Sequence, residues 1–378
     1  MCCADQTRVA RYTIRMIRYS WKTAGWIQCI APLLFVSVGV AFAERQSSAE
    51  SIATTSVASQ AIATLPIKGA AAPMTVTVGA FVNNIPQVDL RANTFEFDAY
   101  IWFRWDPAAW PSSAEGGPAQ TFEIMGASAD CSKEVVYASD GYCCVQVKGV
   151  RTNFWDVRSY PFDQQRLQIV VEDSNFDTRE LIYKADHANS GLAPSLRVSG
   201  CRVQPLEVSV TDFVYPTNFG DPAIAHGAAS SYSRVAFSIP VARESWGIFI
   251  KLFTGLFVAL SVASIALFIN PTQVDPRFGL CVGGLFGIVA SGYAVSSVLP
   301  DSSELGYADK LHVAALICVL LIVMESAIAL ALHLNCEERG ARIARRLDRV
   351  MFVVIVAGYV TAAVTFTLSA MQELTPSV

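Results

Sequence analysis

Four long apolar segments in the C-terminal third of the chain place the strongest constraint on its fold. They cover residues 247–269, 278–299, 311–334 and 350–371. Each reaches the roughly 20 residues that an α-helix needs to cross a bilayer. Because backbone groups left unpaired in lipid are costly, such segments are expected to cross as helices. The sequence therefore predicts an all-α four-helix transmembrane domain over residues 246–378.

The composition agrees with a membrane protein that carries one soluble domain. The chain is 53% hydrophobic and only 16% charged, a balance too apolar for a soluble protein of its 378 residues. The net charge of −4 is small, and no long basic run lies on a soluble segment. The sequence therefore indicates no nucleic-acid partner.

The N-terminus has the pattern of an export signal. Basic residues from Arg8 to Lys22 precede an apolar run at 26–40, and Ala41 and Ala43 form a small-x-small cleavage site. We expect a signal peptide at residues 1–43, with an uncleaved membrane helix as the alternative and the true start codon left open. Residues 44–72 are rich in Ala, Ser and Thr and predict a flexible leader.

Residues 73–245 have the pattern of an all-β domain. Short runs alternate polar and apolar residues, and turn signals containing Gly, Asn, Asp or Pro separate them. This spacing predicts an immunoglobulin-like β-sandwich of about ten strands.

Four cysteines fall in this exported domain, where disulfides can persist. They are Cys131, Cys143, Cys144 and Cys201. A bridge from Cys131 to Cys143 or Cys144 would close a hairpin and leave Cys201 for the other cysteine. The pairing is not determined by the sequence, and free buried thiols are the alternative.

The charges between the apolar segments predict their orientation. Five arginines lie between the third and fourth segments, from Arg339 to Arg349, and mark the cytoplasmic side. The loop between the second and third segments is acidic, which suits the outside. The all-β domain is then outside as well.

The run YPFDQQRLQIVVED at residues 160–173 carries a family resemblance. Pro161 fixes the backbone of a turn, Asp163 can bond nearby backbone, and a half-buried strand follows. The run resembles the signature loop of the pentameric ligand-gated ion channels, the Cys-loop receptor superfamily. Asn153 and Leu167 stand roughly where the animal receptors have their bridged cysteines, so the chain resembles the bacterial type that lacks this disulfide.

Further segments extend the resemblance. Residues 76–107 resemble the family's first two strands, 230–245 its last strand and the start of the first membrane helix, and 275–316 its pore helix and outer loop. The resemblance implies a homopentamer in the bacterial inner (plasma) membrane, with the sandwich in the periplasm or extracellular space. An unknown small-molecule agonist at the extracellular subunit interfaces would open a central pore for inorganic ions.

The resemblance also implies an agonist box of aromatic residues between neighbouring sandwiches, because aromatic faces hold cations and pack apolar ligands. By alignment the box residues are Tyr100, Phe176, Tyr215, Phe219 and Tyr232. For Tyr100 and Phe176, ordinary sandwich core is the alternative.

Helical spacing divides the second membrane segment into faces. The face expected to line the pore carries Gly279, Gly283, Phe286, Ala290, Tyr293 and Ser297, with Asp275 and Arg277 at the inner mouth. Five copies of Phe286 would form an apolar ring that excludes water. Alternatively, the glycines serve close helix packing.

The inner-mouth charges give two conflicting cues on ion selectivity. A ring of Asp275 carboxylates favours cations, whereas the pair Pro276 and Arg277 resembles the entrance of the anion-selective branch. Of the two, the carboxylate would act directly on a passing ion, so we expect the pore to favour cations.

Coupling between the domains is implied for the loop of Pro161, Phe162 and Asp163. This loop would press on the outer loop from Pro300 and Asp301 to Lys310, and Arg243 is placed to pair with Asp163.

Other chemistry has little support in the sequence. Glu325 lies inside the third segment, where a structural hydrogen bond and proton sensing are both open. No histidine has metal-ligand spacing, and no catalytic or cofactor motif occurs, so we expect no metal, no cofactor and no enzyme. The main rival to a channel is a non-conducting receptor of the same fold. A binding module on a membrane anchor is a third option.

Overall fold

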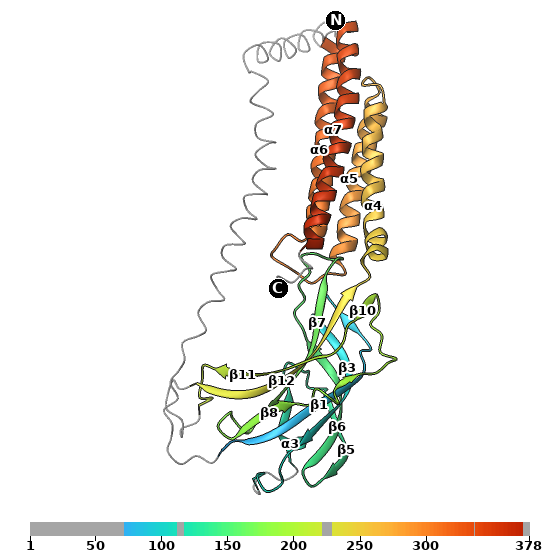
Figure 1. Ribbon diagram of the computed structural model, residues 1–378. Helices are drawn as coiled ribbons and strands as arrows, with labels where there is room; N and C mark the ends of the chain where they lie inside the picture. The colour runs from blue at the N-terminus through green and yellow to red at the C-terminus, as the bar shows by residue number, and fades with distance from the viewer. Residues whose placement is uncertain (1–71, 112–116, 221–228, 336, 373–378) are drawn as a thin grey trace, which may run out of the picture. The chain divides into compact units, whose positions relative to one another are not determined.

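The computed structural model describes residues 72–111, 117–220, 229–335 and 337–372 (Figure 1). The expected signal peptide and flexible leader, residues 1–43 and 44–72, lie outside this part of the chain except for residue 72.

The N-terminal half of the described chain forms two β-sheets. The first sheet has the order β5-β6-β3-β1-β8, with β2 beside β3 and β9 beside β1. Its strands are β1 (Met74–Asn84), β2 (Val88–Asp89), β3 (Thr94–Arg104), β5 (Ser132–Ser139), β6 (Tyr142–Thr152), β8 (Leu181–Ala185) and β9 (Gly191–Leu192). Strand β1 pairs antiparallel with β3 and parallel with β8.

The second sheet has the order β10-β12-β7-β4, with β11 also paired to β12. Its strands are β4 (Phe122–Ile124), β7 (Gln164–Asp173), β10 (Cys201–Val203), β11 (Glu207–Tyr215) and β12 (Ser230–Arg243). A one-turn helix, α3 (Pro118–Thr121), leads into β4.

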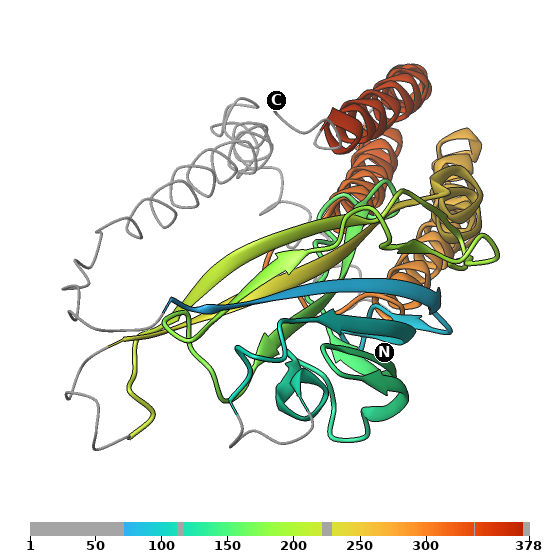
Figure 2. The same cartoon turned by 60° about the horizontal axis from the view of Figure 1, so that its bottom comes forward.

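Period-two alternation builds the core between the sheets. Phe97 and Phe103 on β3, Ile169 on β7, and Phe237 on β12 are all buried in one apolar cluster. Burial of each such side chain stabilises the fold by about 1.5–3 kcal/mol. The two sheets face each other across this cluster (Figure 2), an arrangement that fits the expected β-sandwich.

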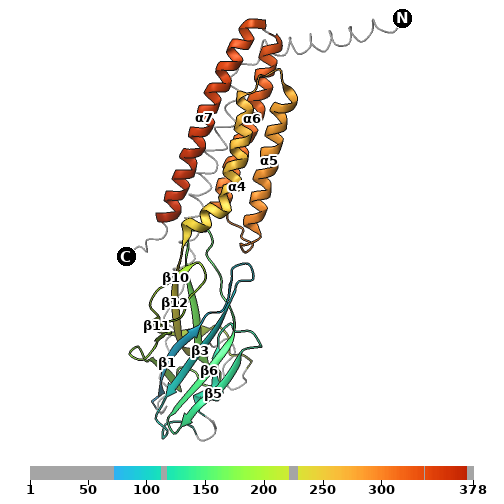
Figure 3. The same ribbon diagram turned by 90° about the vertical axis from the view of Figure 1, so that its right-hand side faces the viewer.

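Four helices follow the sheets (Figure 3). They are α4 (Ser245–Ile265), continued by the 3₁₀ turn η1 (Ala266–Phe268), then α5 (Val274–Ser296), α6 (Tyr307–Asn335) and α7 (Glu337–Gln372). All four are long and apolar enough to cross a membrane. Helix α4 packs against α5, α5 against α6, and α6 against α7. The protein is thus a multi-pass membrane protein.

All four helices begin earlier than the sequence pattern predicts, and the difference is largest for α7. Helix α7 starts at Glu337, so residues 339–349, expected as a basic loop, are helical. Arginine and alanine are good helix formers, and the charged arginines hide the helix from a hydropathy pattern. Helix α5 starts at Val274, with Pro276 in its first turn, where a missing backbone N–H costs nothing.

The expected disulfides are absent from the described residues, where Cys131, Cys143, Cys144 and Cys201 are all free. Strand register explains this. Ser132 pairs with Lys148, which puts Cys131 beside Gly149, about 17 Å along β6 from Cys144 at the usual rise per residue. Cys201 lies opposite Arg243, at the helix-proximal end of the other sheet.

Candidate functional site

A bidentate ion pair joins the signature loop to the end of the last strand, β12. Arg243 donates from Nε to Oδ1 of Asp163 at 2.7 Å and from Nη2 to Oδ2 at 3.0 Å. The two side chains are only 11% and 2% exposed. Burial works to lower the pKa of Arg243, but its bonds to Asp163 outweigh burial and the pKa is raised. The guanidinium also lies over the Tyr160 ring, 4.9 Å from its centroid.

Phe162 anchors the same loop among aromatic rings of the helices. Its ring centroid lies 5.6 Å from that of Trp246, 5.9 Å from that of Phe249 and 5.6 Å from that of Tyr307. Tyr307 is the first residue of α6 and also donates its backbone N–H to the Arg158 carbonyl at 2.7 Å. The signature loop therefore contacts the start of α6.

Within the expected outer loop, Pro300 to Lys310, the contact is made by Tyr307. Asp301 is exposed and Pro300 is half-buried, whereas the loop's aromatic contact is to Tyr307 at the far end of the same connection. A separate hydrogen bond joins the segment after β2 to the end of α5. Arg91 Nη1 donates to the Ser297 carbonyl at 3.2 Å.

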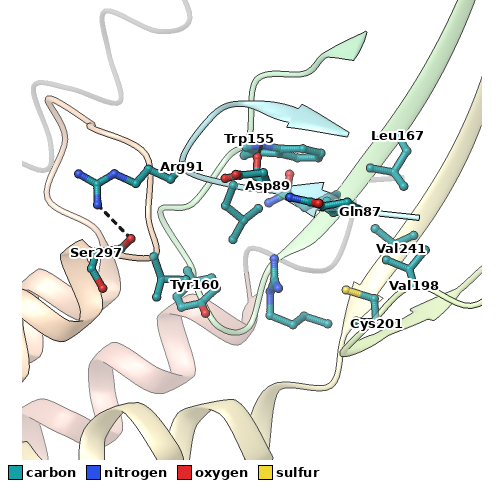
Figure 4. A pocket seen from close by; sticks show the side chains of 16 residues that line it. Gln87, Asp89, Arg91, Trp155, Tyr160, Leu167, Val198, Cys201, Val241 and Ser297 are labelled. Carbon is teal, nitrogen blue, oxygen red and sulfur yellow. Dashed lines mark hydrogen bonds between the residues drawn. The ribbon is translucent and has the colours of Figure 1, made fainter. Parts of the chain in front are cut away.

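A cavity of about 450 Å³ lies at this junction (Figure 4). It is lined by the β2 region, the signature loop, the end of β12 and the end of α5. Trp155 closes one side and donates from Nε1 to the Asp89 carbonyl at 3.2 Å. Cys201 also lines the cavity, and burial raises the pKa of its thiol. The junction is thus incompletely filled.

Three of the expected box residues meet in space. Ring centroids of Tyr215 lie 5.3 Å from Phe219 and 5.7 Å from Tyr232, and Phe219 lies 6.4 Å from Tyr232. The part of the connecting segment at 221–228 lies outside the described residues.

An arginine that sequence reasoning missed is part of this cluster. Arg234 lies over the Phe213 ring at 3.5 Å, pairs with Glu172, and donates from Nη2 to the Tyr215 hydroxyl at 2.6 Å. Burial, followed by a hydrogen bond to Glu172, raises the pKa of Tyr215. The aromatic faces of the cluster therefore already contact one cation of the protein itself.

The other two expected box residues lie apart from this cluster. Phe176 packs edge-on against Trp110 at 5.5 Å, and Trp110 packs on Trp105 at 5.8 Å. Tyr100 is half-buried on β3, directly opposite Gln146. Alternation places Tyr100 on the face of β3 away from the core.

The expected pore face of α5 is open in the single chain. Its residues Gly279, Gly283, Phe286, Ala290, Tyr293 and Ser297 are all exposed. Phe286 is 68% exposed and Tyr293 is 75% exposed.

The glycines of α5 divide into two groups. A methyl group added at Gly283 meets nothing within 4 Å, whereas one at Gly284 or Gly287 would lie 2.7 Å from an alanine of α4. Gly284 and Gly287 therefore permit close packing of α5 on α4. Gly279 and Gly283 lie on the open face.

Arg277, expected at the pore lining, is fully buried inside the subunit. Its Nη2 donates to Glu325 Oε2 at 2.6 Å and to Asp348 Oδ1 at 2.5 Å, and its Nε donates to Ser326 Oγ at 2.9 Å. A guanidinium surrounded by two carboxylates is held away from the open face. Asp275, two residues earlier, remains exposed.

Comparison with known proteins gives one informative similarity. No protein-family model matches the chain. The chain is similar to a proton-gated ion channel of Gloeobacter violaceus, with 20% identity over 300 residues that cover 75% of this chain and 80% of that protein. The aligned region is long enough to include both the sheets and helices.

This similarity and the four membrane-capable helices confirm the resemblance to the pentameric ligand-gated ion channels. The similarity to a channel, rather than to an enzyme, agrees with the lack of catalytic motifs. Among the residues that the structure describes, no group of three His, Cys, Asp or Glu side chains could hold a metal ion.

Proposed function

We propose that the protein is a ligand-gated ion channel that assembles as a homopentamer around a pore lined by α5. The observation that carries this proposal is the open face of α5. Phe286 and Tyr293 expose 68% and 75% of their surface on one helical face, together with the small residues Gly279, Gly283 and Ala290. A single subunit encloses no pore, so several copies around an axis are needed to form one.

The agonist would bind between neighbouring sandwiches. Tyr215, Phe219 and Tyr232 form one wall of the site, and Tyr100 of the adjacent copy is proposed to face them. Arg234 and Glu172 lie behind the wall as an ion pair. Because the relative is proton-gated, acidification is the first stimulus to apply, followed by small organic ligands.

Coupling would run through the junction between the sheets and the helices. Agonist binding would shift β12, which ends in Arg243, and β7, which Asp163 directly precedes. The Phe162 ring would transmit this motion to Tyr307 and the start of α6. The bond from Arg91 to the Ser297 carbonyl offers a parallel route to the end of α5.

Cation selectivity follows from the charges at the other end of α5. Asp275 is exposed there, whereas the positive charge of Arg277 is buried and neutralised by carboxylates. Five Asp275 carboxylates would attract cations to the mouth of the pore. The arginines at 339–349 support a cytoplasmic location for this mouth, which puts the sandwich in the periplasm of a bacterial inner membrane.

A non-conducting receptor of the same fold is the alternative, and large aromatics on a glycine-containing helix favour it. Ion flux from liposomes that contain the purified protein distinguishes the two. Flux that starts on addition of a stimulus supports the channel. Intact pentamers that stay silent under acid and every ligand tried favour the receptor.

A further inference from the structure

The end of α5 remote from the sandwich carries a buried cluster whose formal charges do not balance. Arg277 contributes one positive charge, and Glu325 and Asp348 contribute two negative charges when both are ionised. The three side chains are only 0%, 2% and 6% exposed. An unbalanced charge at this depth is costly, so a fully ionised triad is disfavoured.

The two carboxylates bond to a single nitrogen and therefore lie close together. Both bond to the same nitrogen, Nη2 of Arg277, at 2.6 and 2.5 Å, so the two bonded oxygens are at most about 5 Å apart. Two carboxylates that share a site do not readily ionise together, and one of them retains a proton.

An orphaned oxygen marks the same place. Glu325 Oε1 is buried and has no hydrogen-bond partner among the described residues. A buried acceptor without a donor is costly, whereas a protonated carboxyl can itself donate a hydrogen bond. Arg277 also donates from Nε to Ser326 Oγ and from Nη1 to the Ile269 carbonyl.

Charged and titratable groups around the triad come from three helices. On α5, Cys281 is buried near Arg277 and Glu325, and Asp275 is exposed. On α7, Arg345 and Arg349 flank Asp348 but are exposed, so water screens them. On α6, the titratable group is Glu325 itself. Ile269, the residue that follows η1, contributes only its backbone carbonyl. A proton is therefore the simplest source of the missing positive charge.

We propose that Arg277, Glu325 and Asp348 form a proton-binding site that holds one proton between the two carboxylates and fixes the start of α5. Release of the proton leaves two negative charges against one guanidinium and pushes α6 and α7 apart at this level. Asp275 lies within one turn of Arg277, so the pore mouth would move with it. The effect on gating rests on the proposed channel function, but the proton site itself does not.

Infrared difference spectroscopy of the purified full-length protein tests the site. The probe is the proton, varied by titrating the sample from neutral to alkaline pH. We expect the C=O band of a protonated carboxylic acid at neutral pH, and its loss at alkaline pH. The band should be lost at neutral pH in Glu325→Gln and in Asp348→Asn, because each leaves one carboxylate balanced by Arg277. It should persist in Glu123→Gln, which removes an exposed carboxylate on β4.

Several results would overturn the site. The first is a wild-type protein without the band, and the second is a band that is unchanged in both variants. The third is failure of both variants to fold, because each variant retains a balanced pair of charges and should fold. If one variant fails to fold, the other decides. A wild-type protein that shows the band yet passes no ions counts against the channel and leaves the proton site standing.

Discussion

Asp163 and Arg243 lie far apart in the sequence but form a buried bidentate ion pair where β12 leads into α4, with N–O distances of 2.7 and 3.0 Å. The pair fixes the signature loop against the last strand, and Phe162 places the same loop against Tyr307 of α6. The signature loop is thereby connected to both the last strand and the helices through adjacent side chains.

Loss of this pair should impair gating more than folding. We expect Asp163→Asn and Arg243→Gln to raise the stimulus concentration for half-maximal flux by about 5- to 150-fold, the usual range of allosteric coupling. The control is Glu207→Gln, which breaks an exposed pair with Arg166, because exposed pairs contribute little. Normal gating in both Asp163→Asn and Arg243→Gln would exclude a coupling role.

The apolar ring proposed at Phe286 can be tested by making it polar. Phe286→Ser shortens the side chain and adds a hydroxyl that bonds water, so the variant should leak ions from liposomes without a stimulus. Leu285→Ser, one position along α5, should mainly disturb packing. A leaky Leu285→Ser beside a silent Phe286→Ser would show that another face of α5 lines the pore.

Neighbouring glycines of α5 provide a matched test of helix packing. An added methyl group at Gly284 would lie 2.7 Å from Ala263 Cβ and 2.9 Å from a backbone oxygen, so Gly284→Ala should destabilise the helices by about 1–3 kcal/mol. Gly283→Ala meets open space and should leave the stability near that of the wild type. Thermal unfolding in detergent compares the two variants, and equal melting temperatures would contradict the packing of α5 on α4.

Asp186 in the sandwich should make stability fall in acid. Burial works to raise the pKa of Asp186, but hydrogen bonds from Asn189 and Trp102 and the charge of Arg104 outweigh it and lower the pKa. Its contribution is therefore present above the unfolded value of about 3.9 and is lost as pH falls through the lower folded value. Asp186→Asn should show a smaller loss of stability on acidification than the wild type. Identical acid-unfolding curves would contradict this role.

The sequence predicts the large-scale order well because length and hydropathy are local properties. Four apolar segments and the alternation in β3 and β12 are visible without a structure. Partners set by packing are not visible. Asp348 falls in a segment that hydropathy assigns to a loop, and its contact with Arg277 depends on how α5 packs against α6 and α7. The distance between Cys131 and Cys144 likewise depends on the register of β5 on β6, which the sequence does not show.

Assembly is a separate test from gating. Native mass spectrometry should give about 180 kDa for five chains without residues 1–43, as cyclic assembly requires. A preparation with only monomers or dimers would exclude the proposed pore.

Recording from the purified pentamer in a planar bilayer tests the central proposal most directly. We expect discrete currents that a stimulus, first acidification on the sandwich side, switches on and its removal switches off. The reversal potential in a salt gradient should show that the pore selects cations. In Asp275→Asn the reversal potential should shift toward zero, because the variant is less selective. A pentamer that stays silent under all stimuli, with a silent Phe286→Ser beside it, would contradict the account.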